Sequence, residues 1–154
     1  MLIASVGSAG AFMLSSAIPS GNFTLNASGT AYDSVKRQTI SVTLSVTGTT
    51  SGNLKNMVNL QVKGGTVSAD SYNQFSVSSG EGHAKQKNQD FWLNIHVLSN
   101  AYGGPAALWT FKGTTTSVQG NIISISFSAD SETLPLLGKP TITDVVLTGT
   151  ITLS

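Results

Sequence analysis

The feature that most constrains the fold is a strict alternation of apolar and hydroxyl side chains that recurs along the chain. It is clearest over 39–47, where every second residue is Ile, Val or Leu and each residue between them is Ser or Thr. Comparable runs lie at 91–98, 123–127 and 141–153. A period of two residues places the apolar side chains on one face of an extended strand and the hydroxyls on the other. Because no segment shows helical periodicity, the sequence predicts an all-β protein whose strands each have one solvent-exposed face.

The composition supports this prediction and excludes several kinds of partner. Charged residues make up 10% of the 154-residue chain, and 40 residues are Ser or Thr. Solvated helices need more Glu, Lys and Arg than this chain supplies. The net charge of +1 includes no dense basic run, so we expect no nucleic-acid partner and no membrane contact in the assembled form. Without cysteine there is no disulfide, thiolate metal site or cysteine nucleophile.

The spacing of the alternating runs predicts how the strands are organised. Gly29 and Gly64–Gly65 are expected to end strands, and the polar stretch Gly80 to Asp90 is expected to be a loop. About eight to ten short strands are typical of a sandwich or a barrel. We expect an antiparallel β-sandwich, either jelly-roll or immunoglobulin-like. Its C-terminal strand, 145–154, lacks cations and proline and is predicted to be an unpaired edge.

The first 21 residues differ from the body, which we assign to a single domain at 22–154. They are apolar but diluted with Gly, Ala and Ser, and the first cation is Lys36. Three interpretations remain open: a signal peptide cleaved near Ala17 or Ser20, a strand of the chain's own sheet, or a donor strand that completes the sheet of a neighbouring subunit. The donor-strand interpretation is preferred, and the side chains expected to insert into the neighbour are Val6, Phe12, Leu14 and Ile18.

Few residues could support catalysis. No recognised catalytic or metal-binding spacing occurs among the acidic residues and the two histidines. His83 is expected to be exposed in the polar loop, and His96 to pack beside Trp92 across a strand. Asp130 and Glu132 are interpreted as a solvated pair. We therefore expect no enzyme activity, no cofactor and no metal.

Other residues suggest contacts at the outer surface. Asn22 and Asn26 each begin an N-x-S/T sequon, which predicts N-glycosylation if the host glycosylates exported proteins. Trp92 lies on the face opposite Phe91 and Leu93, so we expect it to be exposed. Trp92 and Tyr102 could form a platform for a sugar or an assembly contact, whereas the alternation places Trp109 in the core.

The apolar tail, the Ser/Thr-rich strands, the low charge, the lack of cysteine and the paired sequons together resemble subunits of archaeal extracellular threads and bundling pili. They are more distantly similar to bacterial biofilm-matrix fibre proteins. The resemblance implies a structural subunit of an extracellular filament that forms a head-to-tail homopolymer by donating the strand at 1–21, and that serves adhesion or biofilm cohesion. A secreted carbohydrate-binding module, with surface polysaccharide as its partner, and a viral coat or tail protein are the alternatives.

Overall fold

The structure is a computed structural model that describes residues 21–53, 55–69, 74–98, 107–129, 133–136 and 139–154. These residues form nine antiparallel strands. In chain order the strands are β1 (Gly21–Asp33), β2 (Gln38–Gly52), β3 (Met57–Ala69), β4 (Phe75–Lys85), β5 (Asp90–Leu98), β6 (Ala107–Gln119), β7 (Ile122–Ala129), β8 (Thr133–Leu136) and β9 (Lys139–Leu153).

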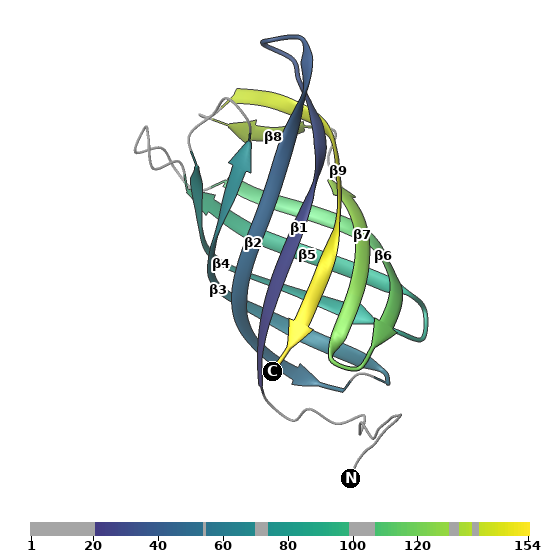
Figure 1. The fold of residues 1–154 in the computed structure, drawn as a ribbon. Coiled ribbons are helices and arrows are strands. Elements are labelled where there is room, and N and C mark those ends of the chain that lie inside the picture. The colour runs from purple at the N-terminus through teal and green to yellow at the C-terminus, as the bar shows by residue number, and fades with distance from the viewer. Residues whose placement is uncertain (1–20, 54, 70–73, 99–106, 130–132, 137–138) are drawn as a thin grey trace.

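The strands close into one barrel, so the predicted two-sheet sandwich is wrong. Each strand from β1 to β6 pairs with the next along the chain, and β9 then pairs with both β7 and β1. β8 pairs with β9 and lies outside the ring, so the closed ring consists of the other eight strands. Figure 1 shows β1 between β2 and β9 at the front of the barrel, with β5 passing behind them. Alternating patterns suit either architecture, since both have one apolar face and one wet face.

The apolar face of every strand of the ring points into the barrel and builds a single core. An eight-stranded barrel has an interior that side chains can fill. Trp109 is 1% exposed, as the alternation predicts, and the ring of Phe127 lies 5.0 Å from Phe91 and 5.3 Å from Phe111. The largest fully buried side chains are Trp109, Phe23, Phe75, Phe91, Phe111, Leu25, Ile40, Leu44, Leu93, Ile95 and Ile125.

Inward-facing glycines let the first and last strands of the ring meet closely. Gly29 on β1 lies opposite Leu147 on β9, and a Cβ at Gly29 would collide with the carbonyl oxygen of Val146. A Cβ at Gly149 would likewise collide with the carbonyl oxygen of Asn26. Glycine within a strand commonly marks such a close backbone approach. Gly29 therefore does not end a strand as expected, because β1 continues through it to Asp33.

Three further predictions about strand limits are also wrong. The stretch Gly80 to Asp90 is not one loop, since β4 runs to Lys85 and β5 begins at Asp90. Gly64 and Gly65 lie inside β3 rather than at its end. The C-terminal strand is not an open edge, because β9 has β1 on one side and β7 on the other.

Candidate functional site

The outer surface of the barrel carries an aromatic pair where β4 and β5 lie side by side. His83 on β4 is paired in register with Trp92 on β5. Their rings stack with centroids 5.8 Å apart and planes 28° from parallel. Trp92 points outward, as the alternation predicts, but it is half-buried rather than exposed as expected. The prediction of an exposed loop histidine is wrong, because His83 lies within a strand and its side chain is 25% exposed.

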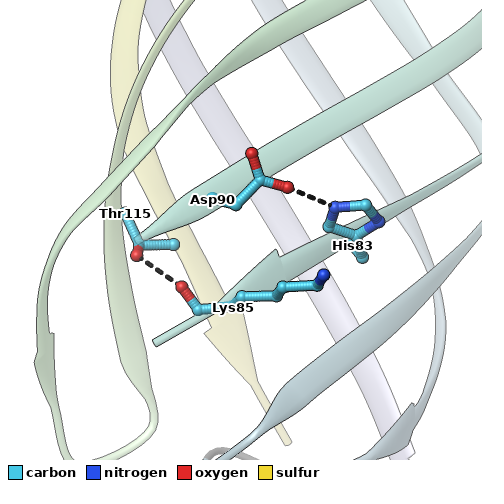
Figure 2. Close-up of polar contacts among 4 residues, drawn as sticks. All are labelled: His83, Lys85, Asp90 and Thr115. Atoms are coloured by element: carbon cyan, nitrogen blue, oxygen red, sulfur yellow. Dashed lines mark hydrogen bonds and ion pairs between the residues drawn. The ribbon is translucent and has the colours of Figure 1, made fainter. Parts of the chain in front are cut away.

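A carboxylate fixes the edge of the imidazole by a hydrogen bond, which is an ion pair when His83 is protonated. The Oδ2 atom of Asp90 lies 2.7 Å from the Nε2 atom of His83, as Figure 2 shows. Asp90 is the first residue of β5, across the hairpin from His83. The imidazole thus lies between a carboxylate and an indole, so both its position and its ring plane are restricted.

The hairpin that supplies Asp90 is itself anchored to the next strand. Thr115 on β6 donates its hydroxyl hydrogen to the carbonyl oxygen of Lys85 at 2.8 Å (Figure 2), and its backbone N–H donates to the carbonyl oxygen of Gln89 at 3.0 Å. The Thr115 side chain is 4% exposed, so these bonds are shielded from water. Bonds from a buried group to both ends of a short turn hold the following residue, Asp90, in place.

These groups surround an open depression of about 390 Å³ lined by His83, Asp90, Trp92 and Lys112. Lys112 on β6 pairs in register with Trp92, so three neighbouring strands supply a row of outward side chains. The row combines a flat apolar ring with three hydrogen-bonding groups: an ammonium that donates, a carboxylate that accepts, and an imidazole that can donate or accept. Such a set can hold a small polar ligand that also has an apolar face. Among the described residues, no group of three or more His, Cys, Asp and Glu side chains could hold a metal ion.

The remaining predicted site residues fall into two groups. The predicted donor-strand residues Val6, Phe12, Leu14 and Ile18, the aromatic Tyr102, and the pair Asp130 and Glu132 lie outside the described residues. Asn22 and Asn26 lie on the outer face of β1 and are exposed. His96 lies on the same face as Trp92 but is exposed.

Sequence reasoning missed the partnership of His83, Asp90 and Lys112 with Trp92. The signal was present in the segment GEGHAK, where Gly82 and Ala84 alternate with Glu81, His83 and Lys85. Small inward residues hid the two-residue period, because glycine and alanine do not register as a hydrophobic pattern.

The part of the chain that the structure describes contains no helix long and apolar enough to cross a membrane. No family model, no curated protein and no solved structure matches this chain.

Proposed function

We propose that this barrel binds carbohydrate on the outer face of β4, β5 and β6. The observation that carries the proposal is the half-buried Trp92, which lines an open depression together with His83, Asp90 and Lys112. Sugars present an apolar face of C–H groups and a rim of hydroxyls. An aromatic ring packs against the C–H face, while charged and polar side chains form hydrogen bonds with the hydroxyls.

The pre-ordered geometry supports binding over a purely structural role for the aromatic pair. The ion pair at 2.7 Å and the stack on Trp92 fix His83 before any ligand arrives. A fixed donor and acceptor set loses little entropy on binding. The described inward side chains form one hydrophobic cluster, so the polar groups that could contact a sugar gather on the outer face.

Calorimetric titration with soluble β-glucan, mannan and galactan tests the proposal. Wild-type protein should bind at least one of them, and Trp92→Ala should weaken that binding about 30-fold, the effect of losing about 2 kcal/mol at a central aromatic contact. Val146→Ala, which shortens an exposed apolar side chain on β9, is the matched control and should bind as wild type does. Failure of all three polysaccharides to bind, or undiminished binding by Trp92→Ala, would overturn the proposal.

A second candidate is the filament subunit, and one feature of the strand arrangement favours it. The segment before Gly21 joins the barrel where the backbone of Asn22 pairs with Ser154. Figure 1 shows β8 at the opposite end of the barrel. Among the described residues β8 has one strand neighbour, β9. An N-terminal segment that joins the barrel at one end, and at the other a strand with a single described neighbour, suit head-to-tail assembly, which need not close and can propagate into a fibre.

The barrel limits how such a filament could form. Every strand of the closed ring already has a neighbour on each side, so a donated strand could add at β8 but not within the wall. Deleting residues 1–20 should then convert fibres into monomers, as judged by negative-stain microscopy and light scattering. Normal fibres from the truncated chain, or no fibres from the full chain, would contradict strand donation. Extracellular location, adhesion and biofilm cohesion remain predictions attached to this candidate.

A further inference from the structure

A second depression lies beside the first on the same outer face. It has a volume of about 400 Å³ and is lined by Gln61, Ser79, Gly80, Glu81, Asn94, His96 and Leu108. Its residues come from β3, β4, β5 and β6, of which the last three also supply the first depression. Asn94 and His96 are the next outward positions after Trp92 along β5. The two depressions therefore follow one another along the same strand.

The register shows that the two regions are continuous. The pair Glu81 and Asn94 lies directly next to the pair His83 and Trp92 on β4 and β5. Outward neighbours on a strand are separated by about 7 Å, so the track from Trp92 to His96 extends about 13 Å. One sugar ring covers only part of that length. A carbohydrate that contacts both depressions must therefore be a chain of linked sugars.

The second depression offers hydrogen-bonding groups that the barrel leaves unused. The Oδ1 atom of Asn94 is buried and has no hydrogen-bond partner among the described residues. Buried polar atoms are nearly always satisfied, so this atom calls for an explanation. Asn94 lines the depression, and we expect its side chain to rearrange about its broad χ2 torsion when a ligand binds, so that a ligand hydroxyl can donate to Oδ1.

The groups around Asn94 fit a second sugar. Glu81 is exposed and has no ion-pair partner among the described residues, so its carboxylate can accept hydrogen bonds from hydroxyls. Gln61 donates its Nε2 hydrogen to the carbonyl oxygen of Gly80 at 3.2 Å, which holds its side chain along the floor. Leu108 is 54% exposed and supplies an apolar contact at the rim.

We infer that the ligand is an oligosaccharide chain of at least two units, with one sugar packed on Trp92 and the next hydrogen-bonded by Glu81 and Asn94. This inference rests on the proposed carbohydrate binding and specifies its ligand class. Glu81 and Asn94 then contribute to the binding of ligands with two or more units and not to the binding of a single sugar.

The test is calorimetric titration with gluco-, manno- and galacto-oligosaccharides of one to six units. Affinity should rise at least tenfold between one and four units in the series that binds. Asn94→Ala and Glu81→Gln should each lower tetrasaccharide affinity about tenfold and leave the affinity for the shortest measurable ligand unchanged. Asn26→Ala, an outward asparagine on β1, is the matched control and should match wild type throughout.

The outcomes separate this inference from the proposed function. Suppose that Trp92→Ala loses binding. If wild-type affinity then does not depend on oligosaccharide length, or if Asn94→Ala and Glu81→Gln both bind the tetrasaccharide normally, the extended site is overturned and the single-sugar site stands. Oligosaccharide binding that is unchanged in Trp92→Ala, or wild-type protein that binds no oligosaccharide, would overturn both the proposed function and the extended site.

Discussion

The two tryptophans of the chain lie on neighbouring strands and on opposite sides of the same barrel wall. Trp109 on β6 points inward and is 1% exposed, against Phe111 with ring centroids 6.4 Å apart. Trp92 on β5 points outward, is half-buried and stacks on His83. The same side chain therefore fills volume on one side of the wall and lines an open depression on the other.

The contrast shows which side of the wall is free to carry function. Inward positions must match the volume of a closed barrel, so their identity is restricted by packing. Outward positions require only a polar side chain that is compatible with a β-strand, and over much of the surface Ser and Thr meet that requirement. His83, Trp92 and Lys112 depart from that simple pattern in one row across three strands.

The largest expected effect is on the inner side. Trp109→Ala should lower the free energy of unfolding by about 3–5 kcal/mol, because it removes a large buried side chain and leaves a cavity. Trp92→Ala should lower it by less than about 1 kcal/mol, since Trp92 is half-buried at the surface. Urea unfolding followed by circular dichroism measures both. Equal losses for the two variants would show that Trp92 is structural, and would break the comparison.

A smaller effect is expected where the barrel closes. Gly149→Val should destabilise the fold by about 2–3 kcal/mol, because the new side chain would collide with the carbonyl oxygen of Asn26 and with Ala27 on β1. Thr148→Val, the adjacent outward position, should change stability by no more than about 0.5 kcal/mol. The same urea titrations apply. A Gly149→Val protein as stable as wild type would contradict the close approach of β1 and β9.

The smallest effect on stability is expected at the outer ion pair. Asp90→Asn should cost less than about 1 kcal/mol, since Asp90 is 51% exposed and surface ion pairs contribute little. Its effect should instead be on polysaccharide affinity, which should fall several-fold because His83 loses its charged partner. Asp144→Asn, an exposed carboxylate change on β9, is the control for both measurements. A stability loss without any loss of affinity would assign the ion pair to folding alone.

Much of the fold follows from the two-residue period. It correctly assigned Ile40, Val42 and Leu44 to the core and Trp92 and Trp109 to opposite faces. It failed at the glycines. The pattern predicts strand ends at Gly29 and Gly64, although β1 and β3 run through them, so it predicts strands shorter than those observed.

The candidate site was predicted only in part, for a related reason. Trp92 could be placed outward from its neighbours alone. The polar stretch at 80–90 concealed a hairpin, however, and with it the pairing that brings His83 to Trp92. Which residues face one another across strands depends on the length and conformation of the turns between them, and this stretch gave no recognised turn signal.

The sequence by itself determined the all-β class and the side of the sheet on which most strand residues lie. These properties are local, because the period of a strand fixes the direction of each side chain relative to its neighbours. Tertiary structure alone decided that the sheet closes, since closure requires residues 23–33 to pair with 142–153 at the far end of the chain. It also decided that His83, Trp92 and Lys112 form one row, because only the register of three strands brings them together.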